Sequence, residues 1–438
     1  MKLIPTKRML KRWAISLGIL LGLLLLFNAV LAWRTESRFE QLVAAVRGEG
    51  DPASITELAP PSIPTDLNAA AFIDAMNPRL ADFGREHGDF YQTELGKQLD
   101  DLPPDEPPND EQVAVMQAIL DRYADLEQQI QTALSAPQYA STADFSLGFN
   151  RFLEEQLARL QQLRTIARFV DWRVQTLLAE GNQQEAIDWS LSLLDLSELC
   201  KGEPTVVSYL VTVAMRNIAL HDLHQSLLTG PTDPTTYAKV DKALDRLELS
   251  NHVESAFRTE RALSISACIE QGWKQAPLVI GNLLGWPIKR HFLGPIELYD
   301  QIIPLADVPY SEIQKEFQAG GILTVPTGKG VLADLLVPSV QGAIEASNRD
   351  IALIRSLRVL NALRHAGDDA QGLDDIDLPT AATTDPFTGK PLVVKKTDSG
   401  WLVYSVGKDQ TDDSGMFEQA KDLGFGPAKG GDRTSRDG

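Results

Sequence analysis

Cysteine is scarce in this chain of 438 residues, which contains only Cys200 and Cys268. Two cysteines cannot build a disulfide scaffold, nor an all-cysteine zinc or iron–sulfur centre. Both lie in apolar stretches of helical pattern. They are expected either to stay separate as buried thiols or to pair with each other in an oxidising compartment.

Basic residues are outnumbered, with 41 Lys and Arg against 60 Asp and Glu and a formal net charge of −19. A surface of that sign repels phosphate backbones, which argues against nucleic acid as a partner. The composition of 43% hydrophobic and 23% charged residues allows a large core. It excludes a chain that is disordered throughout.

Signatures of catalytic centres are also missing. There is no HExxH, GxSxG or dinucleotide fingerprint, and residues 325–330 (VPTGKG) lack two elements of a phosphate loop. His221 and His224 stand three residues apart on an expected helix and, with Glu254, form a candidate polar site. A metal there would need a third ligand. An exported hydrolase with a site between helices therefore remains an alternative.

The N-terminal region has no acidic residue before Glu36. Residues 13–33 carry no charge, lie between two tryptophans and would form a helix roughly 30 Å long, which matches a bilayer core. The basic residues that precede this run are Lys2, Lys7, Arg8, Lys11 and Arg12. Cations of this kind stay in the cytoplasm. We therefore predict a single-pass inner-membrane protein, with its N-terminus cytoplasmic and its body exported.

A cleaved signal peptide is the alternative, because Val30 and Ala32 offer a small-residue cleavage site. The apolar run is longer than the roughly 7–15 residues usual in signal peptides, which favours a retained anchor. Five of the 41 basic residues precede Trp33, so 36 remain against 60 acids in the exported body. Such a body should be repelled by anionic lipid, and no second electrostatic contact with the membrane is expected.

Breaks in the pattern divide the rest of the chain. Residues 67–76 predict a short helix that stops at Pro78, and residues 111–270 show helical periodicity. The turn at residues 177–188 resembles the hinge of a tetratricopeptide-like helix hairpin. The expected divisions are a basic N-terminus (1–12), a transmembrane helix (13–33), a juxtamembrane helix with proline-rich linkers (34–110), a helical body (111–346), a tail domain (347–415) and a flexible C-terminus (416–438).

Residues 272–330 mix glycine, proline and bulky apolar residues without a period, which predicts an irregular segment packed on the helical body. The alternative is a surface that faces the membrane or binds a partner. Its members would be Trp273, Leu283, Leu284, Trp286 and Phe292. Residues 331–363 return to a helical pattern, with an interruption expected at Pro338.

Two β-rich runs, residues 392–396 and 401–406, flank a turn that contains Gly400 and predict a hairpin. A lone hairpin is marginally stable, so it should pack on the helix predicted at residues 347–365. The fold class is therefore mainly α, with an N-terminal transmembrane helix, a body of irregular helical hairpins and a small α+β tail.

The tail carries two specific turns, DPFTGKPL at residues 385–392 and YSVGKD at residues 404–409. Together they resemble the C-terminal segment of type II secretion major pseudopilins. That resemblance implies an acidic calcium-binding loop with Asp409, Asp412 and Asp413 as oxygen ligands, which are the donors that calcium prefers. The N-terminus lacks the processing site of a prepilin, so pilus assembly is not implied.

The whole layout, with a basic anchor, an Asn68-Ala69-Ala70 segment, a helical body and this tail, also resembles a group of uncharacterised bacterial envelope proteins. That resemblance supports the architecture and implies no activity. The expected function is a non-catalytic scaffold or interaction module of the cell envelope, with lipid and an unidentified envelope protein as partners. A role as an accessory component of a secretion system is a further alternative.

Overall fold

The computed structural model describes residues 7–102, 106–248, 253–273, 286–306, 308–318, 331–367, 369–417 and 421–427. These residues form a mainly helical protein with one small antiparallel sheet, as the sequence predicts. The helices are α1 Lys7–Gly48, α2 Ala69–Phe90, α3 Glu94–Asp100, α4 Asp110–Asp121, α5 Ala124–Leu134, α6 Phe149–Ala179, α7 Gln183–Leu199, α8 Val206–Leu228, α9 Pro234–Glu248, α10 Val253–Trp273, α12 Trp286–Ile302, α13 Tyr310–Gln318 and α14 Val331–Ala366.

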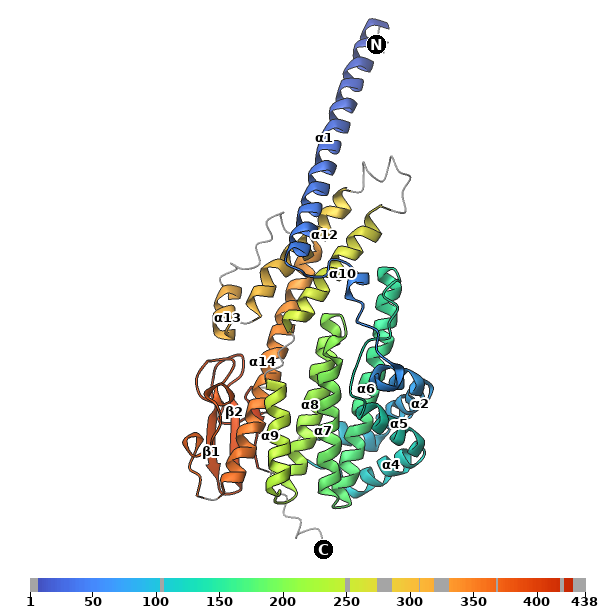
Figure 1. Ribbon diagram of the computed structural model, residues 1–438. Coiled ribbons are helices and arrows are strands. Elements are labelled where there is room, and N and C mark those ends of the chain that lie inside the picture. The colour runs from blue at the N-terminus through green and yellow to red at the C-terminus, as the bar shows by residue number, and fades with distance from the viewer. Residues whose placement is uncertain are drawn as a thin grey trace.

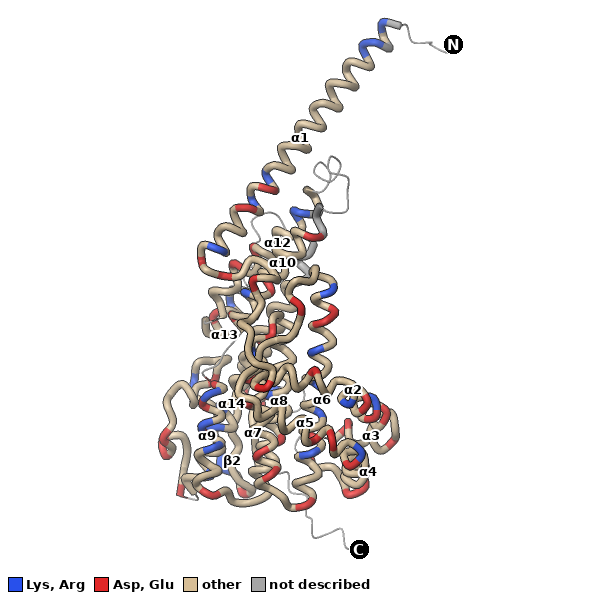
Figure 2. The backbone as a smooth tube through the Cα atoms, turned by 45° about the vertical axis from the view of Figure 1, so that its right-hand side comes forward, with Lys and Arg blue, Asp and Glu red and all other residues tan. Residues whose placement is uncertain are grey.

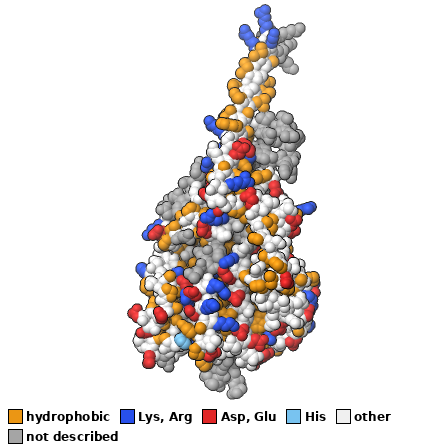
Figure 3. Space-filling model, in the orientation of Figure 1, with side chains coloured by type: hydrophobic (Ala, Val, Ile, Leu, Met, Phe, Trp, Pro, Cys, Tyr) orange, Lys and Arg blue, Asp and Glu red, His pale blue; other side chains and the backbone are white. Residues whose placement is uncertain are grey.

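Helix α1 is a single rod of 42 residues that projects from a compact body (Figure 1). Its apolar side chains from Ile15 to Phe27 are exposed along the rod, and basic residues stand at its free end (Figure 3). The rod has the length and hydropathy of a helix that can cross a membrane, and its apolar stretch is not buried in the protein. The C-terminal part of α1, from Phe39 onward, packs into the body.

The main core lies between α2, α4 to α9 and α14, and Trp172 of α6 is at its centre. The indole is fully buried, and Phe83 and Phe90 of α2 contact it edge-on. The predicted stop at Pro78 is therefore wrong, because α2 continues to Phe90 with Pro78 inside the helix. Burial of the apolar face of α2 on this core offsets the free energy lost with the hydrogen bond that proline removes.

The hinge predicted at residues 177–188 joins α6 to α7. The amide of Asn182 donates to the carbonyl of Leu177 and the amide of Gly181 donates to Leu178, which closes the end of α6. Gly181 has a φ of +80°, which only glycine adopts without strain. Ala186 is fully buried where the two helices meet, as the sequence indicates.

Helix α14 connects the body to the tail (Figure 1). Arg358 pairs with Asp241 and Glu248 of α9, and one face of α14 supports the sheet. The expected interruption at Pro338 is wrong, since the helix runs unbroken from Val331 to Ala366. Burial of residues such as Val340 and Ile344 just after the proline holds that turn in place.

Residues 272–330 are more regular than predicted. Where the structure describes them, α12 and α13 replace the expected irregular chain. Pro287 occupies the first turn of α12, where its missing N–H costs nothing, and Pro295 lies inside the same helix. The apolar residues around these prolines are buried, namely Leu293, Ile296, Leu298, Tyr299 and Ile302. That burial outweighs the weak helical pattern of the sequence.

The tail forms a sheet in the order β1 (Val393–Thr397), β2 (Gly400–Ser405) and β3 (Leu423–Phe425). The predicted hairpin is confirmed, with Val394 opposite Val403 and Thr397 opposite Gly400. The expectation of a flexible C-terminus is wrong for β3, which is buried and pairs with β2. Gly424 permits this pairing, because a side chain there would collide with the carbonyl of Val403.

Asp385 joins the two turns that carry the pseudopilin resemblance. Its buried carboxylate accepts the amide of Phe387 at 2.8 Å in its own turn. It also accepts the Ser405 hydroxyl at 2.8 Å and the Val406 amide at 3.1 Å at the end of β2. One side chain therefore fixes the turn before the hairpin to the strand end after it.

We expect Asp385→Ala to destabilise the tail by about 3–5 kcal/mol, because three buried donors lose their acceptor. Amide hydrogen exchange of β1 and β2 in the full chain should accelerate. The control is Asp398→Ala in the exposed hairpin turn, which should leave exchange unchanged. Equal exchange rates in both variants would contradict the assigned role.

Candidate functional site

The junction between α1 and the body combines apolar contacts with a network of ion pairs. It begins with an apolar cluster in which Phe39, Leu42 and Val46 of α1 pack against Cys268 of α10 and Leu293 of α12. Three helices from distant parts of the sequence thus share one small core. The sequence pattern shows an apolar face on residues 34–47 but does not identify what covers it.

Arg261 of α10 lies at the centre of the polar part of this junction. Its guanidinium is 2% exposed and binds Asp51, in the turn after α1, and Asp300 of α12, the latter at 2.5 Å. Glu49 lies 3.4 Å away on the solvent side. Burial raises the pKa of Asp300, and the hydrogen bond from Arg261 opposes that rise. A buried cation surrounded by carboxylates from two other segments holds all three together.

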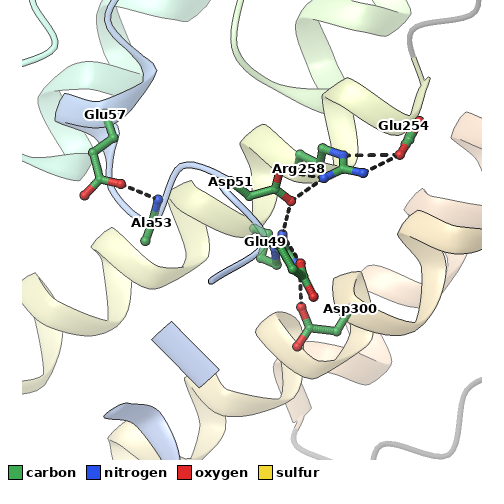
Figure 4. A network of polar contacts seen from close by, with 8 residues as sticks. Glu49, Asp51, Ala53, Glu57, Glu254, Arg258 and Asp300 are labelled. Carbon is green, nitrogen blue, oxygen red and sulfur yellow. Dashed lines mark hydrogen bonds and ion pairs between the residues drawn. The ribbon is translucent and has the colours of Figure 1, made fainter. Parts of the chain in front are cut away.

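A second arginine extends this network toward solvent (Figure 4). Arg258 binds Asp51 at 2.5 Å and Glu254 at 2.5 Å. The pair of Glu254 and Arg258 is the one expected from the spacing of four residues. The pKa of Arg258 is raised, most by its hydrogen bond to Glu254. Asp51 is therefore shared by two guanidinium groups one helical turn apart on α10.

The chain that leaves α1 is also fixed. The amide of Ala53 donates to Glu57 at 2.8 Å, and this bond lowers the pKa of the Glu57 carboxyl (Figure 4). The amide of Ile55 donates to the hydroxyl of Ser266 on α10 at 2.9 Å. Residues after Gly48 thus pack on α10 instead of forming a free linker.

Nearer the apolar part of α1, helix α12 runs alongside it. Lys289 is buried, pairs with Glu36 and lies 4.3 Å from the centre of the Phe39 ring. Arg38 pairs with Glu297 at 2.9 Å. The indole N–H of Trp286 donates to the side chain of Asn28 at 2.5 Å.

The predicted interaction surface is only partly described. Trp286 is half-buried against α1, and Phe292 is half-buried against the apolar cluster of the junction. Trp273 is the last residue of α10. Leu283 and Leu284 lie outside the described residues. Of the predicted set, the structure places Trp286 and Phe292 on the same helix, next to α1.

The predicted polar site is not brought together. The ring of His224 is fully buried, and its Nε2 lies 2.9 Å from the carbonyl of Gly426, beside β3. Burial lowers the pKa of His224 to about 3. His224 and His221, which are one turn apart on α8, both pack against the ring of Phe425. Both histidines therefore dock the tail on the body.

Glu254 belongs instead to the junction. Near it on α10, Glu260 accepts the amide of Val206 at the start of α8. His224 comes eighteen residues later on α8, roughly 27 Å along the helix. Glu254 and His224 are thus far beyond bonding reach. Among the described residues, no group of three or more His, Cys, Asp or Glu side chains is arranged to hold a metal ion.

Two carboxyls that the sequence does not single out, Asp171 of α6 and Asp222 of α8, are close enough for their charges to interact, and Asp222 is buried. The side-chain amide of Gln175 donates to Asp222 at 3.4 Å and to Gln225 at 2.8 Å. Burial raises the pKa of both carboxyls, that of Asp171 to about 6. The negative charge of one carboxylate opposes ionisation of the other, so the pair favours a state in which one proton is bound.

The cysteines do not pair. Cys200 and Cys268 are both free and buried, and they lie in different apolar clusters. Burial raises the pKa of both thiols, that of Cys268 to about 12, so neither is a ready nucleophile. The expectation that the two cysteines stay separate as buried thiols is confirmed.

A small cavity of about 40 Å³ lies beside Cys200, with Glu203, Tyr209 and Arg216 among its lining residues. Arg216 is buried and pairs with Asp350 of α14 at 2.9 Å. A space of that size holds a few water molecules. It is far smaller than the roughly 300–1,000 Å³ of a pocket for a small-molecule substrate.

The acidic loop predicted to bind calcium follows β2. Asp409 accepts the amide of Thr411, Asp412 accepts the hydroxyl of Tyr404 at 2.6 Å, and Asp413 lies 3.5 Å from the amine of Lys421. The hydrogen bond from Tyr404 lowers the pKa of Asp412. Each carboxylate thus has a different protein partner, and calcium binding stays a prediction.

Comparison with known protein families finds no model that matches this chain, and comparisons with curated proteins and with solved structures likewise give no match.

We expect Arg261→Ala to destabilise the junction by about 3–5 kcal/mol, because Asp51 and Asp300 are left partly buried without their shared cation. Chemical unfolding of the full chain in detergent, followed by protease cleavage after α1, measures the effect. The control is Arg258→Ala. This side chain is 35% exposed, so its loss should cost about 1 kcal/mol or less. Equal costs would contradict the central position of Arg261.

The pair of Asp171 and Asp222 predicts a pH dependence of stability. Both pKa values are higher in the folded chain than the value of about 3.9 for a free carboxyl. Protonation therefore favours the folded state, and this contribution is full below about pH 4 and is lost as pH rises through the raised pKa values, of which that of Asp171 is about 6. Asp222→Asn should raise the stability at pH 8 by roughly 1–3 kcal/mol and change it little near pH 4.5.

Melting temperature measured across this pH range tests the prediction. Asp100→Asn, at an exposed position, serves as the matched control and should follow the wild-type curve. If Asp222→Asn is as stable as the wild type at every pH, the two carboxyls do not share a proton.

Proposed function

We propose that this protein is a single-pass membrane protein whose exported body acts as a non-catalytic scaffold of the cell envelope. The observation that carries the proposal is the unbroken α1, which is apolar and exposed over one half and bonded to the body over the other. Figure 2 shows the same division, with an uncharged stretch between a basic end and the charged junction. Helix α1 is thus both the anchor and a structural element of the body.

The orientation follows from charge. Lys2, Lys7, Arg8, Lys11 and Arg12 precede the apolar run, and cations flanking a membrane helix stay on the cytoplasmic side. The body then lies outside the cytoplasm, at the inner membrane. The junction supports retention of α1, because cleavage after Ala32 would remove Asn28, the partner of Trp286, and would leave Phe39 and Arg38 on a frayed end.

A binding role agrees with the interior of the body. The cavity beside Cys200 has room for only a few waters. The histidines predicted for a hydrolase site dock the tail on the body instead. The polar groups buried in the body join helices to one another, as Arg216 joins α8 to α14 and Arg358 joins α9 to α14. Such a body presents a rigid surface to an envelope protein.

The tail adds a second part to the proposal, drawn from the resemblance to pseudopilins. The resemblance rests on two turns, and Asp385 bonds both of them. We extend it to the loop after β2, where Asp409, Asp412 and Asp413 would supply oxygens to calcium. An accessory role in a secretion system would follow from the same resemblance and rests on nothing else.

Membrane topology is the direct test. An epitope placed before Met1 should remain on the membrane-bound protein and be protected in intact cells without an outer membrane. Protease added to those cells should digest the body. A body that resists external protease, or one found soluble without the epitope, would contradict the proposal.

Calcium binding to the tail has its own test. Calcium should raise the melting temperature of the full chain in detergent, and Asp409→Ala should abolish the rise. Asp398→Ala, outside the loop, is the control and should keep it. An unchanged melting temperature in the wild type removes calcium from the proposal and leaves the anchored scaffold untouched.

A further inference from the structure

The cavity beside Cys200 is lined by three segments, namely the turn that follows α7, one face of α8 and the first two turns of α10. Two of its lining residues, Lys201 and Ser255, are exposed. Thr212 and Arg216, one turn apart on α8, are both only 2% exposed. The cavity therefore runs from a mouth at the protein surface inward to Arg216.

The guanidinium of Arg216 has one paired edge and one unpaired edge. Its Nη1 lies 2.9 Å from Oδ2 of Asp350 on α14. Within the part of the chain that the structure describes, neither Nε nor Nη2 has a hydrogen-bond acceptor, and both are closed to bulk water. These two nitrogens form the fork of an arginine, whose N–H bonds point the same way. Buried donors without an acceptor cost free energy, which an acceptor in the adjoining cavity would recover.

The groups that line the cavity call for an acceptor and not for a donor. Its charged residues have partners, since Lys201 pairs with Glu198 at 2.6 Å and Glu203 lies 3.8 Å from Arg159. Among the described side chains of the lining, the buried polar atoms left without a partner are the two fork nitrogens of Arg216. The first turns of α10 also present the positive end of a helix dipole, which favours negative charge.

The size of the cavity limits what can accept those hydrogen bonds. A volume of about 40 Å³ has room for a few waters, and so for a ligand of about three to five heavy atoms. A carboxylate has two oxygens on one side, which match the two N–H groups of an arginine fork. Acetate has this chemistry at this size, whereas a peptide or a nucleotide is too large for the space.

We propose that the cavity binds a small free carboxylate, whose two oxygens accept the hydrogens on Nε and Nη2 of Arg216. The bound carboxylate joins α8 to α10 and, through the pair of Arg216 and Asp350, to α14. Because α10 also carries Arg261, the site is connected to the junction with α1. The proposal goes beyond the scaffold role and does not depend on membrane anchoring.

The test uses the full chain in detergent at pH 7, with sodium acetate compared with sodium chloride at equal concentration. Saturation transfer from the protein to the acetate methyl group, measured by NMR, reports binding directly. We also expect acetate at about 50 mM to raise the melting temperature by about 2–5 °C more than chloride does. The comparison with chloride removes the general effect of salt.

Two variants locate the binding. Arg216→Lys keeps a cation for Asp350 but removes the fork, and it should reduce both the saturation transfer and the melting-temperature rise at least fivefold. Ser255→Phe places a ring at the exposed mouth and should have the same effect, with the melting temperature in chloride unchanged. The matched control is Ser62→Phe, at an exposed position outside the cavity, which should bind acetate as the wild type does.

Each outcome decides the proposal. If acetate gives no saturation transfer and stabilises no more than chloride, the cavity holds only water and the proposal is wrong. Acetate binding that persists in Ser255→Phe lies elsewhere and also overturns it. Binding that Ser255→Phe abolishes and Arg216→Lys retains overturns the role of the fork. If Arg216→Lys does not fold, the comparison of Ser255→Phe with Ser62→Phe decides alone.

Discussion

The attachment of α1 to the body depends on one buried cation. Arg261 places its guanidinium between Asp51 after α1 and Asp300 on α12, at a site almost closed to water. A buried charge of this kind is costly unless its partners are held in the right geometry. The apolar contacts of Phe39, Leu42 and Val46 supply that geometry. The junction is therefore stable only as a whole, which makes the position of the body relative to α1 specific.

The same arrangement explains why the chain after α1 is ordered in spite of its prolines. Residues 51–66 contain Pro52, Pro60, Pro61 and Pro64, which favour an extended path. Asp51, Ala53 and Ile55 each bond to a fixed partner along this path. The segment then enters α2, whose apolar face belongs to the main core. A region that reads as a linker is thus part of the folded body.

Much of this architecture can be predicted from local sequence. The apolar run, the hinge at Gly181 and the hairpin at Gly400 each depend on neighbouring residues, and each is found. The helix breaks expected at Pro78 and Pro338 are not found. Pro78, Pro295 and Pro338 all lie inside helices, because burial of the surrounding turns outweighs the local cost of proline.

The site itself could not be predicted, since its members are far apart in sequence. Arg261 and Asp51 are separated by 210 residues, and β3 pairs with β2 across an acidic loop. The spacing of Glu254 and Arg258 indicates an ion pair within one helix. No local pattern, however, shows which segment Arg261 binds. Asp171 and Asp222 likewise look like ordinary surface acids of two amphipathic helices until the helices are packed together.

The unbroken course of α1 has a mechanical consequence. Fifteen residues separate Trp33 from Gly48, a further 22 Å or so of helix without a hinge, and the body is bonded along this length. Membrane helices commonly tilt by about 20° from the bilayer normal. Since the body is clamped to this lever, any such inclination would swing its far end sideways and bring one flank down toward the lipid. In the proposed membrane-anchored state, the tilt of α1 would therefore determine which face of the molecule is turned to its neighbours.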